Sequence, residues 1–196
     1  EMCIRDRFSI SAISFIPGKK AITEGKITYE IDFGEMEMEL DPMSASMMKD
    51  AELIISFKGE YIKTEFDMGL ANVEYVAAGK SNTGIMKMNM MGNKMAIEMS
   101  EAEFQQYKGN ENEVDVKYTG ETKEIAGYVC KKAITTDKDG NSATYYFTEK
   151  IVPETRNTQF SNTKINGFPL QMDVKQGPMT ITMTAKKVEA TKIDSK

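Results

Sequence analysis

The chain has 196 residues and a net charge of −5, with 28 % charged and 40 % hydrophobic residues, which predicts one folded domain with a real core. It holds 16 methionines but no histidine and no tryptophan. The missing histidine excludes Ser-His-Asp and Cys-His triads and HExxH zinc sites, and the acidic charge does not favour nucleic-acid binding. We therefore expect a protein that is not an enzyme, with no catalytic residues, no metal site and no cofactor.

The N-terminal segments differ from the rest of the chain. Residues 1–7, EMCIRDR, resemble the translation of a transposase adapter used to prepare sequencing libraries, and we expect them to be a sequencing artefact. Cys3 is then foreign and Cys130 is the one native cysteine, which leaves no internal disulfide framework. Residues 8–20 begin with the apolar run FSISAISFI, which predicts a signal-peptide remnant or linker, with an edge strand as the alternative. We assign residues 21–196 to a single β-rich domain, which we expect to be truncated at its C-terminus.

Strand signals dominate this domain. Alternating apolar and polar residues predict a strand at 26–33, and the alternation changes parity at Gly34, which predicts a bulge or bend there. Asp41 and Pro42 predict the start of a short helix that ends at Lys49. Further strands are expected at 51–57, 61–68 and 73–77.

A methionine-rich hairpin, IMKMNMMGNKMAIEM, follows at residues 85–99. We predict a two-residue turn at Gly92-Asn93, which would pair Lys87 with Glu98. Because strand side chains alternate, one face would carry this ion pair and the other face would be apolar. The apolar face would consist of Met86, Met88, Met90, Met95, Ile97 and Met99.

After the hairpin, Ser100 and Glu103 form a capping box that predicts a second short helix through Tyr107. Strands are then expected at 114–118, 123–126, 128–135 and 144–148. A last hairpin joins strand 169–175 to strand 179–188. One face of strand 179–188 would consist of Met179, Ile181, Met183 and Ala185.

This order of elements predicts a mainly β fold. Many short strands joined by hairpins, without βαβ alternation, imply a large antiparallel sheet. A sheet of that size must curl or split. We therefore expect a large curled antiparallel sheet, an incomplete half-barrel, with the two short helices on its concave side.

Five blocks of sequence resemble the exported bacterial domain-of-unknown-function family four-four-one-two. In chain order they are KGE at 58–60, MMGNKMAIEM at 90–99, GETKEIAGYVCKKA at 120–133, TQF at 158–160 and GFPL at 167–170. That family is related to the LolA/LolB-like lipoprotein carrier fold, an incompletely closed antiparallel half-barrel that binds acyl chains in its hollow under a lid of helices. The resemblance implies this fold but no functional residue, because the family has no established site.

The methionine-rich faces are the candidate binding surface. Methionine fills irregular gaps in a core and also suits adaptable pockets, so core and acyl-chain pocket both stay open as interpretations. Thioethers also bind Cu(I), although no histidine supports such a site here. The candidate ligand-binding residues are Met36, Met38, Met86, Met88, Met90, Met95, Ile97, Met99, Met179 and Met183.

Cys130 is the remaining chemical group of interest. It alternates with Tyr128 and Ile134, which predicts an inward position. A lone buried thiol usually acts as a small hydrophobe, and no activating base is visible near it in the sequence.

These observations favour non-catalytic binding or transfer of a lipid, lipoprotein or other hydrophobic ligand. The alternative is a structural or sensory envelope module without a small ligand, and the third is Cu(I) binding through methionine clusters. The expected partners are a hydrophobic small molecule or acyl chain and lipoproteins, with no nucleic acid and at most peripheral contact with a membrane. We expect an exported protein, periplasmic or associated with the outer membrane of a Gram-negative bacterium.

Overall fold

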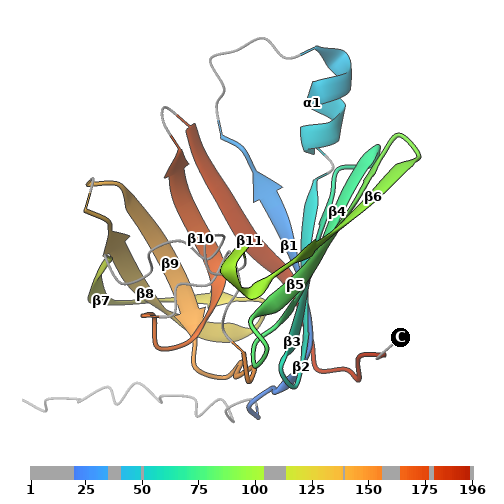
Figure 1. Cartoon of the computed structure of the whole chain (residues 1–196). Coiled ribbons are helices and arrows are strands. Elements are labelled where there is room, and N and C mark those ends of the chain that lie inside the picture. Colours follow the sequence, from blue (N-terminus) through green and yellow to red (C-terminus); the bar gives the residue numbers. More distant parts are fainter. Residues whose placement is uncertain are drawn as a thin grey trace, which may run out of the picture.

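Eleven strands form one antiparallel sheet in the computed structural model (Figure 1). The structure describes residues 20–34, 41–49, 51–103, 114–138, 140–155, 164–176 and 179–194. The strand order is β6-β5-β4-β3-β2-β1-β11-β10-β9-β8-β7. Strands that are consecutive in the chain are neighbours except for β6 and β7, which lie at the two edges, and the two halves of the chain join where β1 pairs with β11.

The bounds of the strands agree closely with the predicted segments. The first half of the sheet contains β1 (Glu24–Asp32), β2 (Glu52–Lys58), β3 (Tyr61–Asp67), β4 (Ala71–Ala78), β5 (Thr83–Met90) and β6 (Asn93–Met99). The second half contains β7 (Asp115–Ile125), β8 (Tyr128–Thr136), β9 (Ser142–Thr148), β10 (Phe168–Gln176) and β11 (Met179–Glu189).

Strand β7 corrects one prediction. The segments 114–118 and 123–126, expected as two strands, are one strand whose register with β8 shifts between Tyr118 and Thr122. Gly120 lies inside this irregular stretch with a φ of 80°, a conformation that glycine adopts without strain. The local irregularity therefore bends the strand without ending it.

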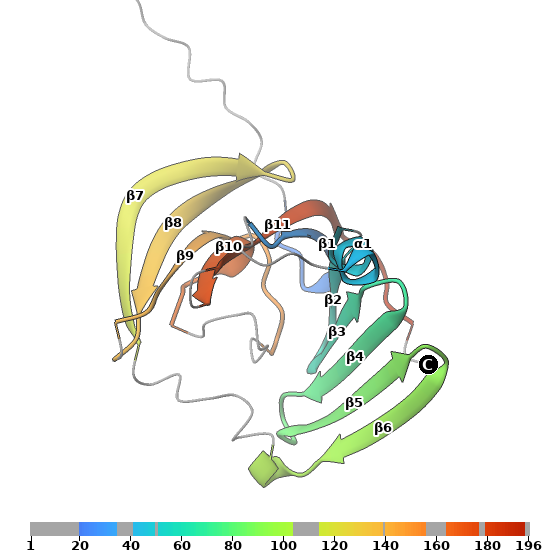
Figure 2. The same cartoon turned by 90° about the horizontal axis from the view of Figure 1, so that it is seen from above.

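The sheet curls without closing. Seen from above, it forms a C whose two free edges are β6 and β7 (Figure 2). The predicted fold class, a large curled antiparallel sheet forming an incomplete half-barrel, is thereby confirmed. A twisted sheet of this size must curl to bury one face, and the side chains on the concave side then meet one another.

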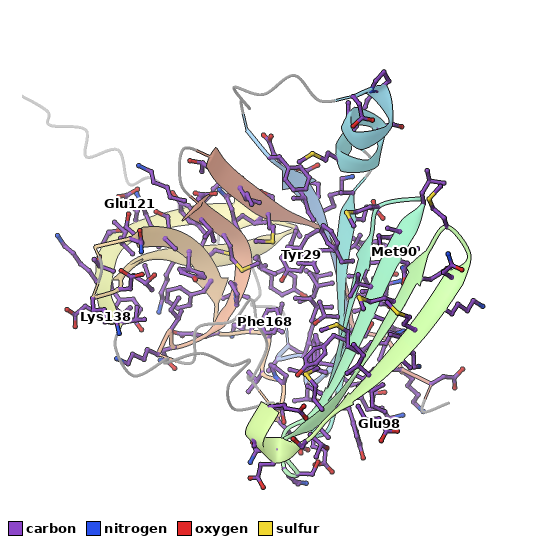
Figure 3. The ribbon with its side chains drawn as sticks, turned by 45° about the horizontal axis from the view of Figure 1, so that its top comes forward. Tyr29, Met90, Glu98, Glu121, Lys138 and Phe168 are labelled. Atoms are coloured by element: carbon purple, nitrogen blue, oxygen red, sulfur yellow. The ribbon has the colours of Figure 1, made fainter. Side chains whose placement is uncertain are left out.

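The main core lies on the concave side, between the two halves of the sheet. The ring of Phe57 on β2 lies 5.9 Å from the ring of Phe168 on β10, although β1 and β11 separate these strands in the sheet. The hydroxyl of Tyr29 on β1 donates a hydrogen bond of 2.7 Å to the carbonyl of Pro169. Figure 3 shows Tyr29 and Phe168 in this interior. Such contacts across the hollow fix the curvature of the sheet.

The residues before β1 and after β9 lie side by side in a short parallel pairing. Ile22 forms an isolated parallel bridge with Ile151, and its backbone bonds Lys150 and Val152 through two contacts of 2.8 Å. Both isoleucines are buried in the main core. This pairing connects the start of the domain to its second half.

The one helix with both ends in the described residues is α1 (Pro42–Lys49), which agrees with its prediction. It stands beyond the ends of the strands and not inside the hollow, as both views show (Figures 1 and 2). Of the second predicted helix, the structure describes only the start. There the capping box is confirmed, because Ser100 Oγ donates to Glu103 Oε2 at 2.6 Å and the Glu103 carboxylate also accepts the Ser100 N–H at 2.8 Å. Within the described residues no helix is long and apolar enough to cross a membrane.

Several predictions fall outside the described residues. These are the adapter-like residues 1–7, the segment 8–20 apart from Lys20, and the second helix beyond Glu103. Strand β1 ends at Asp32, and Gly34, where a bulge or bend was predicted, has a φ of 63°, outside the range of an extended strand. The candidate residues Met36 and Met38 lie beyond it, in the segment that is not described.

Candidate binding surface on the inner face

The candidate site is the concave face of strands β1 to β6, which we call the inner face. Directly paired residues of antiparallel neighbours point to the same side of a sheet, so the pairings define rows that cross the strands. One row is Tyr29, Leu53, Phe66, Val73, Met88 and Met95. The next row is Ile27, Ile55, Thr64, Tyr75, Met86 and Ile97.

Exposure rises along these rows from the core to the free edge. Leu53 is 0 % exposed, whereas Met95 in the same row is 56 % exposed and Ile97 in the next row is 48 % exposed. We call the exposed end the methionine edge, and it comprises Met86, Met88, Met90, Met95, Ile97 and Met99. The inner face therefore continues from a closed core into an open apolar surface without a polar strand between them.

The floor of the methionine edge is formed by β4. Met86 and Met99 pack against the buried residues Tyr75 and Ala77. The Tyr75 side chain lies over Gly84, where an added Cβ would come within 2.9 Å of the Tyr75 hydroxyl. Glycine at position 84 thus gives the tyrosine room to lie flat against the sheet.

The hairpin that carries the edge has a different register from the predicted one. The turn consists of Met91 and Gly92, with φ of 52° and 89°, and Met90 pairs with Asn93. A two-residue turn with positive φ at both positions matches the twist of the flanking strands. The Met91 N–H also bonds the Leu70 carbonyl at 3.0 Å, which holds the tip against the loop before β4. The prediction of a Gly92-Asn93 turn is therefore wrong by two positions in register.

Because the error is an even number of residues, every hairpin side chain keeps its predicted face. Met88 now opposes Met95, and Met86 opposes Ile97. The structure thus brings together all six hairpin residues that were predicted to share an apolar face.

The predicted ion pair between Lys87 and Glu98 is not formed. Lys87 opposes Ala96 in the observed register, and its Nζ lies 2.9 Å from a carboxylate oxygen of Glu74 on β4. Glu74 also lies 3.8 Å from Lys63 on β3. These charges form a network on the outer, convex face, where water can solvate them.

Of the other predicted ligand-binding residues, Met183 is the one whose side chain the structure describes, and it does not join the methionine edge. Met183 is buried in the main core, opposite Ile31 on one side and Met172 on the other. Met179 lies at the start of β11, and its side chain is outside the described set. For Met183 the structure favours the core interpretation.

Sequence reasoning missed residues at the tip of the edge. Leu70 is 50 % exposed and Met91 is 73 % exposed, and the Met91–Leu70 hydrogen bond places them side by side. The prediction also missed Val73 and Tyr75, which continue the rows toward the core. The alternation at 73–77 was visible in the sequence, and pairing it with the hairpin would have found both residues.

Two buried groups of the main core have raised pKa values. Cys130 is fully buried, as predicted, and burial raises the pKa of its thiol to about 12, although a backbone hydrogen bond at Ile125 and the charge of Lys123 act in the opposite direction. Burial, and then the neighbouring Cys130, raise the pKa of Tyr29 well above its usual value. Both groups therefore stay protonated at neutral pH.

Two surface recesses lie elsewhere in the described structure. One, of about 480 Å³, lies between residues 20–24, Tyr128 and residues 190–192. The other, of about 400 Å³, is lined by residues of β7, β8 and β9 with Asn166. Neither contains a residue of the methionine edge, where Met90, Met95 and Ile97 are about half exposed. Among the residues described, no group of three or more His, Cys, Asp or Glu side chains is arranged to hold a metal ion.

The fold and its inner face define an open antiparallel half-barrel with one exposed apolar wall. No family model matches the chain, and no curated protein matches its sequence. Among solved structures it is similar to the crystal structure of MucB, with a TM-score of 0.42 and 8 % identity, over 88 % of this chain and 55 % of the MucB chain. It is also similar to LprF from Mycobacterium bovis, with a TM-score of 0.34 and 10 % identity, over 88 % of each chain. The chain spans about half the length of the MucB chain.

Proposed function

We propose that this protein binds an apolar ligand, such as an acyl chain, on the methionine edge without catalysing a reaction. One observation carries the proposal: a single row of apolar residues passes from Leu53, which is 0 % exposed, to Met95, which is 56 % exposed. Contiguous exposed apolar surface of this kind marks binding sites more often than it occurs without a role.

The chemistry of the edge suits a ligand of variable shape. Methionine side chains are unbranched and polarizable, so they adapt to different chains. Burying an acyl chain contributes about 0.8 kcal/mol per CH₂, so about ten buried carbons supply up to ~8 kcal/mol before the entropic cost of binding.

We further propose that the protein acts in the bacterial cell envelope. The signal-like run at the start of the chain and the five sequence blocks shared with an exported family support this location. In that setting the ligand would be a lipid or the acyl chains of a lipoprotein, and the protein would carry or hold it.

The proposal is tested with two isoleucines on opposite faces of the same hairpin. Ile97 is 48 % exposed on the inner face, and Ile85 is 39 % exposed on the outer face. Ile97→Gln is expected to weaken binding of a fluorescent fatty acid by about tenfold, whereas Ile85→Gln leaves it unchanged. Mass spectrometry of an organic extract of the purified protein is expected to detect lipid.

The two isoleucine variants also define how the proposal fails. Equal loss in both variants with retained circular dichroism would show that the inner face is not the site. Absence of fatty-acid binding and of extracted lipid would favour the structural or sensory module.

Cu(I) binding is the second candidate, because Met88 and Met95 oppose each other directly across β5 and β6. The double variant Met88→Leu/Met95→Leu separates the two functions, since leucine keeps the apolar surface and removes the thioethers. Fatty-acid binding that survives this change, with no Cu(I) competition against a chelator in the unaltered protein, supports the apolar-ligand proposal. The reverse result would replace it with Cu(I) binding.

A further inference from the structure

The free edge of β6 is a surface that the proposed function does not use. The Met91-Gly92 turn places Met90 and Asn93 in the closing pair, which is hydrogen-bonded in a two-residue hairpin. Hydrogen-bonded pairs recur at every second residue, so the backbone groups of Met95 and Ile97 point toward β5. The backbone groups of Lys94, Ala96 and Glu98 therefore point away from the sheet. The bond from the Met91 N–H to the Leu70 carbonyl agrees with this phase. These two residues extend the pairing of β5 with β4 by one position, so the odd-numbered backbone groups of β5 point toward β4.

No strand pairs with these outward groups in the part of the chain that the structure describes. Strand β6 also pairs with β5 in an unbroken register. The opposite edge, β7, is interrupted by its register shift near Gly120, a device that discourages further pairing. Of the two free edges, β6 is the one that is regular enough to accept another strand.

In the sequence of β6, NKMAIEM, the opposite charges Lys94 and Glu98 lie at equal distances on either side of Ala96, so two antiparallel copies can pair them. If Ala96 faces Ala96 of a second copy, Lys94 opposes Glu98 of that copy, and this pairing occurs twice. Met95 then opposes Ile97 of the second copy on the inner side. The registers that centre on Lys94 or Glu98 instead bring like charges together, which is unfavourable. The registers that centre on Met95 or Ile97 leave both charged residues opposite uncharged ones. Charge therefore favours the register centred on Ala96, in which opposite charges meet.

The charges concerned have no other salt bridge within the described residues. On the outer face Lys63, Glu65, Glu74 and Lys87 are linked to one another over distances of 2.9 to 3.8 Å. Lys94 and Glu98 flank the end of this network, are exposed, and form no ion pair with it among the described residues. Glu98 lies on the outer side of the sheet (Figure 3). A second copy would supply the missing partner for both side chains.

We propose that two copies of this chain form a symmetric dimer by antiparallel pairing of their β6 strands, centred on Ala96, with Lys94 of each copy paired to Glu98 of the other. The two sheets become one continuous sheet. The methionine edges of the two copies then adjoin, because Met95 and Ile97 meet their counterparts across the symmetry axis.

The charges allow a reciprocal test by sedimentation over a range of protein concentrations. The unaltered protein is expected to dimerise. Lys94→Glu alone and Glu98→Lys alone each create like-charge pairs and are expected to raise the dimer dissociation constant by about tenfold or more. An equimolar mixture of these two variants restores opposite charges in a heterodimer, and the double variant Lys94→Glu/Glu98→Lys restores them in a homodimer. Both are expected to associate like the unaltered protein.

A backbone variant tests the strand pairing itself. Ala96→Pro removes the central outward N–H and leaves the hydrogen bonds to β5 in place, since proline is tolerated on edge strands. It is expected to be monomeric with unchanged circular dichroism. A monomeric unaltered protein overturns the proposal, as does a dimer that persists in Ala96→Pro or in the single charge variants, or a mixture that fails to associate.

Discussion

The two ends of the inner face have the same sequence pattern and opposite environments. On β2, Leu53 is fully buried, and on β6, Met95 in the same row is more than half exposed. Both residues are apolar and both occupy inward positions of an alternating strand. The difference arises because Phe168 on β10 contacts Phe57 on β2 across the hollow and closes the core there, whereas β6 is a free edge of the sheet (Figure 2). Burial in this protein depends on what lies opposite a residue.

The largest expected effect is the difference between truncating a buried and an exposed side chain of the same row. Leu53→Ala leaves a cavity in a closed core and is expected to lower the free energy of unfolding by about 2–5 kcal/mol. Met95→Ala removes side-chain atoms that are already in water, so its cost is expected to stay within ~0.5 kcal/mol. Urea unfolding followed by circular dichroism measures both. Similar losses in the two variants would mean that the methionine edge is covered in solution.

A smaller effect is expected at the join between the two halves. Tyr29→Phe removes the 2.7 Å hydrogen bond to the Pro169 carbonyl and leaves that buried acceptor without this donor. The expected cost is about 1–3 kcal/mol in the free energy of unfolding. Tyr61→Phe is the matched control, because Tyr61 is 55 % exposed. An equally small change in both variants would contradict the structural role of the Tyr29 bond.

The buried thiol of Cys130 is expected to make the free energy of unfolding depend on pH. Its pKa is raised from 9.0 to about 12 in the folded state, so the unfolded chain loses this proton first as pH rises. The contribution of this thiol to the free energy of unfolding is therefore constant below pH 9 and falls as pH rises from 9 toward 12, by up to about 1.4 kcal/mol per pH unit. Unfolding titrations of the unaltered protein and of Cys130→Ala isolate this contribution as the difference between their slopes. Identical slopes would show that the thiol ionises equally in both states.

The smallest effect is expected on the outer face of the exposed end. Lys87→Ala removes the 2.9 Å contact with Glu74, yet both groups are reached by solvent. The cost is expected to be below about 1 kcal/mol and to shrink further in high salt, because surface ion pairs are screened. Thermal unfolding at two salt concentrations measures it. A larger loss that does not respond to salt would indicate that the lysine stem contributes by packing.

Much of the candidate surface was predictable from local pattern. The hairpin at 85–99 placed its methionines on one face, and a register error of two residues did not change this result, since side chains alternate with a period of two. The pairing partner of Lys87 was not predictable in the same way. Glu74 lies on another strand, and its position opposite Lys87 depends on how β4 pairs with β5.

The sequence by itself determined most of the strands, the presence of the methionine hairpin, the face on which its side chains lie and the inward position of Cys130, because backbone alternation is local. Only the tertiary structure decided which methionines are core and which are exposed. Met183 and Met95 occur in equally apolar alternating strands, but the first is enclosed between Met172 and Ile31 and the second lies at a free edge. The physical reason is that burial requires an opposing wall, and here that wall comes from strands distant in the chain.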